Sequence, residues 1–89
     1  MATLSLRIVN EKGLHARASA KFVEVVEEFD AGAQVMRDGM AVSGDSIMGL
    51  LMLAASRGTT IEVETSGPQA EALAAALTAL VTDRFGEDR

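Results

Sequence analysis

The sequence contains no cysteine, tryptophan or tyrosine, and it has one histidine and one proline among its 89 residues. The absence of cysteine excludes disulfide bridges, zinc sites built on thiolates and cysteine nucleophiles. A single histidine excludes metal sites that need two histidines, and it excludes proton relays between histidines. Any chemistry that this chain performs must therefore depend on very few groups.

Long apolar runs and an excess of positive charge are also missing. The longest apolar run, residues 47–55 with a glycine inside it, is too short to span a bilayer, and the N-terminus does not read as a signal peptide. Acidic residues outnumber basic ones by 13 to 8, and the net charge of −5 disfavours general binding to nucleic-acid backbones. We therefore expect a cytoplasmic protein that inserts into no membrane and binds no nucleic acid.

The residues that are present suit one small globular unit. Hydrophobic residues make up 48% of the 89 residues, whereas aromatic residues make up 3% and are all phenylalanine. The core must therefore be built mainly from aliphatic side chains and methionine, and the chain is too short for a second core. We expect a single domain that spans residues 1–89.

Hydrophobic periodicity predicts four strands and three helices. Apolar residues that alternate with polar ones predict strands at residues 3–8, 33–36, 40–43 and 61–64. The Asp38-Gly39 pair predicts a type I′ hairpin turn that sets Val35 opposite Val42. The order β-α-β-β-α-β-α predicts an α+β open-faced sandwich, in which a four-stranded antiparallel sheet carries three helices on one face.

The predicted helices differ in how clearly their ends are marked. Apolar residues at helical spacing predict a first helix over residues 16–30 and a second over residues 47–54. Ser66 and Gln69 fit a capping box at the start of the last helix, which we expect to end at Gly86 before a frayed terminus. The residues expected on the buried faces of the first and last helices are Ala18, Phe22, Val25, Phe29, Ala70, Leu73, Leu77, Leu80 and Val81.

The single histidine lies where the first turn meets the first predicted helix. In many chains a histidine at such a position only caps the helix. Here Gly13 lets the backbone approach closely, the helix start offers unpaired backbone N–H groups, and Arg17 adds a fixed positive charge. A neutral imidazole is a competent nucleophile at cellular pH, so His15 inside an anion site is suited to accepting a phosphoryl group.

Two short segments resemble motifs of one known family. Residues 13–17 (GLHAR) resemble the active-site signature of HPr, the histidine-containing phosphocarrier proteins of the phosphotransferase system, and residues 45–50 (DSIMGL) are similar to their regulatory serine segment. The resemblance covers essentially the whole chain. It implies that Nδ1 of His15 takes a phosphoryl group from enzyme I, which draws it from phosphoenolpyruvate. The phosphohistidine then passes the group to a IIA-type acceptor.

Further roles follow from this resemblance. We expect the backbone N–H groups of Ala16 and Arg17 to hold the phosphoryl oxygens, and the Arg17 guanidinium to balance their charge. Many family members have proline where this chain has Ala18, which is a good helix former and fills the same space. We expect a monomeric carrier rather than an independent enzyme, because the chain has no second catalytic group and the partners supply the chemistry. The resemblance implies no bound cofactor or metal, because Mg²⁺ and phosphoenolpyruvate belong to the enzyme I step.

The second motif predicts a regulatory site and a docking surface. The resemblance implies that an HPr kinase/phosphorylase modifies Ser46, although serine is also a common helix N-cap and Asp45 is an alternative cap. The helix that follows is apolar around nearly its whole circumference, so part of it must stay exposed or meet a partner. We expect Leu50 and Leu53 to be buried. The residues expected to contact partners are Ile47, Met48, Leu51, Met52, Ala20 and Glu24.

Some alternatives stay open on the sequence alone. Glu24 and Glu27 stand where many family members have lysines, so either a sugar-uptake or a nitrogen-regulatory branch of the system fits. A ferredoxin-like sensor domain has a similar element order, and it predicts a dimer in which His15 and Arg17 have no role. A small acyl-phosphate hydrolase would use a loop arginine and Asn10, the only asparagine, but no glycine-rich phosphate cradle accompanies it.

Overall fold

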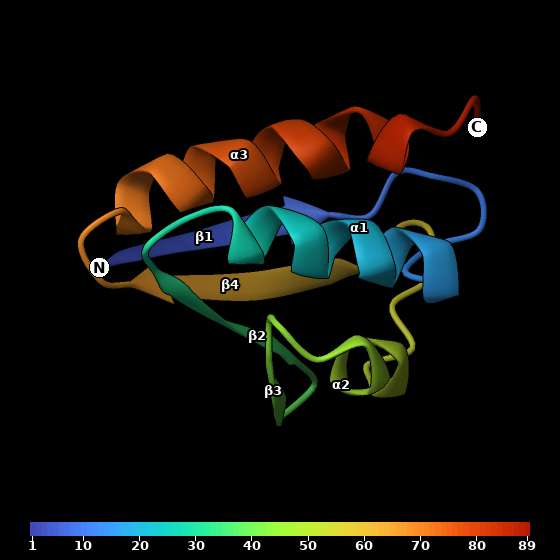
Figure 1. Ribbon diagram of the computed structural model, residues 1–89. Helices are drawn as coiled ribbons and strands as arrows, with labels where there is room; N and C mark the ends of the chain where they lie inside the picture. The colour runs from blue at the N-terminus through green and yellow to red at the C-terminus, as the bar shows by residue number, and fades with distance from the viewer.

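The computed structural model describes residues 1–89, which form one sheet with helices on one face (Figure 1). The strands are β1 (Ala2–Arg7), β2 (Gly32–Arg37), β3 (Met40–Ser43) and β4 (Thr60–Ser66). The helices are α1 (Ala16–Glu27), α2 (Ile47–Met52) and α3 (Ala70–Thr82), followed by a short 3₁₀ turn, η1 (Arg84–Gly86). The predicted open-faced sandwich and its element order are confirmed, and η1 is an addition.

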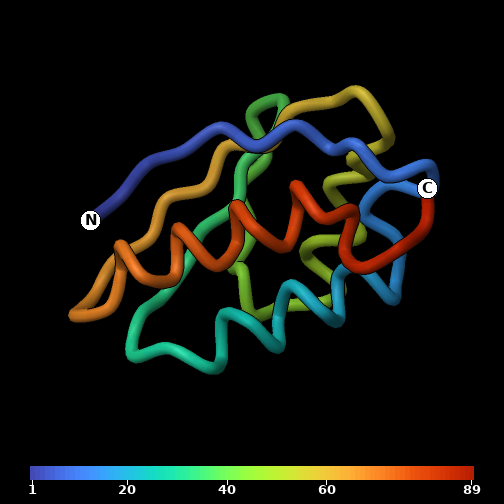
Figure 2. Tube along the Cα trace, turned by 90° about the horizontal axis from the view of Figure 1, so that it is seen from above, coloured from blue at the N-terminus to red at the C-terminus, as the bar shows by residue number.

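The sheet topology brings the C-terminal segment beside the turn that follows β1, at the end of the molecule opposite the N-terminus (Figure 1). The strands lie in the order β1-β4-β2-β3, and all three pairings are antiparallel. Because β4 pairs with β1 and α3 runs back over both strands, the end of α3 reaches the turn that follows β1 (Figure 2). The C-terminal segment and the turn between β1 and α1 therefore meet beside the start of α1.

The core lies between the sheet and the helices and contains 17 buried hydrophobic residues. Burial alternates along β4, where Ile61 and Val63 are buried and Glu62 is exposed, as the period of two predicts. Most of the fully buried side chains are aliphatic, and two phenylalanines, Phe22 and Phe85, complete them. None of the helices has the length and apolar character needed to cross a membrane.

The hairpin between β2 and β3 has the predicted turn and register. Asp38 and Gly39 adopt positive φ angles of 51° and 80°, as both central positions of a type I′ turn require. Val35 pairs with Val42. A two-residue turn with this backbone twist leaves only one register for the flanking strands, so the local signal was sufficient.

The first two helices end earlier than expected. α1 stops at Glu27 rather than near residue 30, and Val25 and Phe29, which were expected on its buried face, are only half-buried. Its buried stripe instead consists of Ala18, Ser19, Phe22, Val23 and Val26. α2 stops at Met52, two residues short of the predicted end, because Ala54 adopts a positive φ of 51° that a right-handed helix cannot contain.

The predicted capping box at the start of α3 is wrong. Ser66 is the last residue of β4, and the helix begins at Ala70 with Gln69 at the N-cap and no side-chain cap. The Gln69 side chain is used elsewhere, since its Oε1 accepts a hydrogen bond of 2.6 Å from the backbone N–H of Asp30. The buried face of α3 is as predicted, except that Leu80 is half-buried.

The C-terminal segment packs against α1 instead of fraying. Arg84, Phe85 and Gly86 all adopt positive φ, so the chain turns back toward α1 after α3 ends at Thr82. Phe85 is fully buried, and Lys21 Nζ donates to its carbonyl oxygen at 2.6 Å. Gly86 therefore belongs to this turn and does not end the helix.

Candidate functional site

His15 is the N-cap residue of α1. Its extended backbone, with φ −80° and ψ −177°, leads the chain into the helix, and its Nδ1 accepts a hydrogen bond of 3.2 Å from the backbone N–H of Arg17. The side chain is 28% exposed, so the ring is partly accessible to another molecule. The nitrogen that caps the helix is therefore Nδ1, the atom to which the family resemblance assigns the phosphoryl group.

The turn before His15 is fixed by close packing at Gly13. This residue adopts a φ of +68°, and a Cβ added to it would lie 2.6 Å from the carbonyl oxygen of Ala55. The next residue, Leu14, donates its backbone N–H to that same oxygen at 2.8 Å. No larger residue fits this position without moving the turn, so the glycine is needed for close packing against Ala55, and this packing holds the histidine backbone in place.

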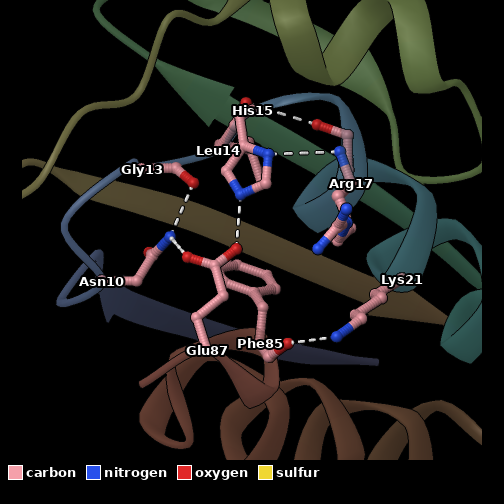
Figure 3. A network of polar contacts seen from close by, with 9 residues as sticks. Asn10, Gly13, Leu14, His15, Arg17, Lys21, Phe85 and Glu87 are labelled. Carbon is pink, nitrogen blue, oxygen red and sulfur yellow. Dashed lines mark hydrogen bonds and ion pairs between the residues drawn. The ribbon is translucent and has the colours of Figure 1, made fainter. Parts of the chain in front are cut away.

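The other ring nitrogen of His15 contacts the C-terminal segment. Nε2 makes a short hydrogen bond to one carboxylate oxygen of Glu87, and the second oxygen accepts from Asn10 Nδ2 at 3.0 Å (Figure 3). Asn10 is fully buried and also donates to the carbonyl oxygen of Gly13 at 2.8 Å. The imidazole therefore has a defined partner on each side.

The Glu87 carboxyl is shaped by opposing electrostatic effects. Burial on its own would raise the pKa of Glu87, but the hydrogen bonds from His15 and Asn10 and the electrostatic attraction of His15 and Lys12 outweigh it, so the pKa is lowered. Its side chain is 17% exposed. At neutral pH the carboxylate beside the ring is therefore ionised.

A cleft of about 650 Å³ opens beside the ring and carries charges of both signs. Arg17 and Lys12 form no ion pair with any acidic side chain, because the two ion pairs of the chain are His15–Glu87 and Arg37–Asp38. These two cations are therefore free to meet an anion in the cleft. The lining residues are Glu11, Lys12, His15, Ala16, Arg17, Glu87, Asp88 and Arg89.

The comparisons with known proteins agree with this geometry. A family model described as "PTS HPr component phosphorylation site" matches residues 2–83. The phosphocarrier protein HPr of Neisseria meningitidis serogroup A is 46% identical over 87 residues, 98% of each chain, and the phosphocarrier protein NPr of Escherichia coli K12 is 40% identical over 85 residues, 94% of each. HPr-C-His from Thermoanaerobacter tengcongensis has a TM-score of 0.94 at 34% identity over the whole of both chains. The chain belongs to the HPr family.

It is a phosphocarrier protein of the phosphotransferase system, as the resemblance of residues 13–17 and 45–50 implied. The comparisons give no support to the ferredoxin-like sensor domain. The hydrolase alternative also loses its amide, because Asn10 is fully buried and its Nδ2 is bonded to Gly13 and Glu87. Since relatives named HPr and NPr both match, the likeness is shared by both groups.

The second HPr motif forms the start of α2. Ser46 is the N-cap, and its Oγ accepts a hydrogen bond of 3.0 Å from the backbone N–H of Gly49. Asp45 is not the cap, because its carboxylate accepts a hydrogen bond of 2.5 Å from Ser43 Oγ. A Cβ on Gly49 would lie 3.0 Å from Val42, so glycine allows α2 to pack closely on β3.

The apolar residues of α2 divide between core and surface. Leu50 and Leu53 are buried, as predicted. Met48 is 69% exposed, Met52 is 64% exposed and Ile47 is 40% exposed, as predicted. Leu51 was expected to be exposed, but it is half-buried, because it lies on the flank of this short helix. α2 packs beside α1, on which Ala20 is half-buried and Glu24 is exposed. We call Ile47, Met48 and Met52 the α2 patch.

Two residues of the histidine site were not found as such from the sequence. Glu87 was expected to fray, and Asn10 was considered only for a hydrolase. Glu87 lies 72 residues from His15 in the chain, and no short motif links positions so far apart. The only available signal was Asn10 itself, a lone asparagine beside the turn that carries the histidine.

Proposed function

We propose that His15 is the residue that carries the phosphoryl group, with Nδ1 as the attacking atom. One observation carries this proposal: Nδ1 points at the backbone N–H of Arg17 in the first turn of α1. A nitrogen that accepts a hydrogen bond has its lone pair on that side, and the start of a helix stabilises anions. A phosphoryl group on Nδ1 would therefore meet N–H donors at once.

The transfer itself needs no group beyond the ring and its surroundings. The Nδ1 lone pair forms a bond to phosphorus while the bond between phosphorus and the donor breaks, and that electron pair leaves with the donor. In onward transfer the P–N bond breaks and its electron pair returns to Nδ1. A phosphoramidate is reactive enough for both directions, whereas a serine ester is not.

Ala16 and Arg17 are proposed to hold the phosphoryl oxygens. Their backbone N–H groups lie in the first turn of α1, where no preceding helical carbonyl is available to accept them. The exposed Arg17 side chain lines the same cleft as His15 and forms no ion pair, so its guanidinium is free to balance the added charge. The single domain spanning residues 1–89 thus acts as a carrier without a resident cofactor or metal, and not as an independent enzyme.

The partners proposed are enzyme I as donor, a IIA-type protein as acceptor and an HPr kinase/phosphorylase, all meeting a cytoplasmic monomer. The α2 patch supports a shared docking surface, because exposed methionines adapt to different partners. Leu51, Ala20 and Glu24 are proposed to border it. Ser46 is proposed as the regulatory site, and its position at the start of α2 places any added phosphate beside the α2 patch.

Labelling with enzyme I and radioactive phosphoenolpyruvate tests the proposed carrier residue. We expect acid-labile, base-stable label on the chain and none on the His15→Ala variant, whose circular dichroism should be unchanged. Label retained by His15→Ala would refute the assignment.

The Arg17→Ala variant tests the proposed charge balance. It should slow transfer by tens-fold or more, since a charged hydrogen bond contributes roughly 1.5–3 kcal/mol, with little change in melting temperature.

A further inference from the structure

We propose that Glu87 is a positioning residue for His15, and that buried Asn10 holds Glu87 in place. This inference rests on the proposed function of His15 and adds the group that governs the far side of its ring. The juxtaposition is direct, since one Glu87 oxygen bonds to Nε2 and the other accepts from Asn10 Nδ2 at 3.0 Å (Figure 3).

The hydrogen bonds around the ring select one tautomer. Nδ1 faces a backbone N–H, which can only donate, so this nitrogen must present its lone pair. Nε2 faces an ionised carboxylate, which can only accept, so this nitrogen must carry the proton. Both contacts favour the same tautomer, and that tautomer leaves Nδ1 as the nucleophile.

Glu87 reaches the ring through a segment that is anchored on both sides. Before it, Phe85 is fully buried, and Lys21 of α1 donates to the Phe85 carbonyl oxygen at 2.6 Å. After it, the backbone oxygen of Arg89 accepts a hydrogen bond of 3.0 Å from the backbone N–H of Glu11. Non-glycine residues with positive φ, such as Phe85, persist only where the surrounding structure enforces them. The contact with His15 therefore belongs to the packed structure of the chain.

Asn10 fixes the direction of the carboxylate. It is fully buried, and its Nδ2 donates to both Glu87 and the carbonyl oxygen of Gly13, the turn residue before the histidine. One side chain thus ties the C-terminal segment to the turn that carries the ring. This arrangement matches the two needs of a nucleophilic histidine, a fixed orientation and a compensated charge.

The consequence for transfer concerns charge. When Nδ1 forms its bond to phosphorus, the ring becomes positively charged and shares that charge with its Nε2–H, while the donor leaves with its electron pair. The Glu87 carboxylate already accepts that N–H, so the positive charge forms beside a negative group. The other charged residues that line the cleft are Glu11, Lys12, Arg17, Asp88 and Arg89, and none of their side chains bonds to Nε2.

The test uses the full chain and three variants. Glu87→Ala removes both acceptor oxygens. Glu87→Gln keeps the size but offers one acceptor atom to two donors, the Nε2–H and Asn10 Nδ2. Asp88→Asn is the matched control, because Asp88 lines the same cleft and its loss changes the net charge by the same amount without touching the ring.

The first measurement is independent of transfer. In ¹⁵N-labelled chain at mildly alkaline pH, where free imidazole is neutral, we expect an Nε2–H proton resonance that is protected from exchange with water. It should persist in Asp88→Asn, weaken in Glu87→Gln and disappear in Glu87→Ala. A resonance that is absent from the unaltered chain, or present unchanged in Glu87→Ala, would overturn the proposal.

The second measurement is the rate of phosphoryl transfer from enzyme I. We expect the maximal rate to fall roughly ten- to hundredfold in Glu87→Ala, in proportion to one charge-assisted hydrogen bond, with KM unchanged because the α2 patch is intact. Asp88→Asn reports the effect of the lost charge alone, and its rate should differ from that of the unaltered chain by less than the rate of Glu87→Ala does, because Asp88 makes no hydrogen bond to the ring. Equal rates for Glu87→Ala and the unaltered chain would refute the positioning role. If the unaltered chain took no label, the carrier assignment would fail, while the resonance would still report the Glu87 contact.

Discussion

Replacing Asn10 by aspartate should destabilise the chain strongly at neutral pH and much less in mild acid. The Asn10 side chain is fully buried, and its Nδ2 donates to the Gly13 carbonyl oxygen at 2.8 Å and to Glu87 at 3.0 Å. The Asn10→Asp change preserves the shape but replaces this donor with a second carboxylate. Two facing carboxylates at about 4 Å repel by about 4 kcal/mol at an effective dielectric constant near 20.

The chain can avoid this repulsion by protonating one of the two carboxyl groups, but protonation costs about the same free energy as the repulsion. Protonation at pH 7 of a group that ordinarily titrates near pH 4 costs about 4 kcal/mol, at about 1.36 kcal/mol per pH unit. The lost hydrogen bond to Gly13 adds about 1 kcal/mol. We therefore expect a loss of about 5 kcal/mol at pH 7, and only about 1–2 kcal/mol near pH 4.5.

A loss of this size is large for a chain of 89 residues, whose free energy of unfolding is expected to be about 4–13 kcal/mol. The assay is urea unfolding followed by circular dichroism at both pH values, because the chain has no tryptophan or tyrosine to report by fluorescence. Asn10→Ala is the control. It removes the same two hydrogen bonds without adding charge, and it also removes Oδ1, which has no hydrogen-bond partner.

The two variants are separated by their response to pH. Asn10→Ala should lose about 3 kcal/mol at both pH values, whereas Asn10→Asp should be less stable than Asn10→Ala at pH 7 and at least as stable near pH 4.5. If Asn10→Asp is unfolded at pH 7, acidification should restore its structure. A gap between the variants that does not change with pH would show that Asn10 does not face the Glu87 carboxylate as described.

Three further outcomes are expected. Gly13→Ala should lose about 1–3 kcal/mol of stability from its positive φ, plus the cost of moving Ala55, measured by urea unfolding. Because the pKa of Glu87 is lowered in the folded chain, the ionised carboxylate stabilises the fold at pH values above the ordinary pKa of 4.5. The stability of the unaltered chain relative to Glu87→Gln should therefore shrink as the pH falls below 4.5. A stability difference that stays constant with pH would contradict this expectation. Enzymatic phosphorylation of Ser46 should slow the labelling of His15, because the charge of the phosphate lies beside the α2 patch. The melting temperature should stay equal or rise, because a phosphate at a helix start is tolerated. A large fall in melting temperature would show that the effect comes from unfolding instead.

The features that the sequence predicted well depend on neighbouring residues. The Asp38-Gly39 turn restricts the backbone so strongly that the register of β2 and β3 follows from it. Ser46 caps α2 for the same local reason, since a serine before an apolar helical segment suits an N-cap. Where a competing tertiary contact exists, the local signal fails, as when the Gln69 side chain bonds to Asp30 instead of closing a capping box.

The C-terminal segment shows why the rest could not be predicted. Positive φ at Arg84 and Phe85 has no sequence signal, because both residues ordinarily avoid that region of backbone space. What enforces it is the burial of Phe85 in a core formed by segments far away in the chain. A prediction based only on residues close together in the sequence expects residues 87–89 to fray, whereas the packed structure shows that they are held in place.

The two nitrogens of His15 illustrate the same division within one side chain. The partner of Nδ1 is the backbone N–H two residues later, a donor that the start of α1 at His15 places close to the ring. The partner of Nε2 arrives from 72 residues away and depends on α3, η1 and the buried Asn10. The proposed nucleophile is therefore positioned by local structure, whereas the tautomer and charge compensation proposed for it require the complete fold. It follows that variants which loosen η1 should impair transfer even though they lie far from the α2 patch.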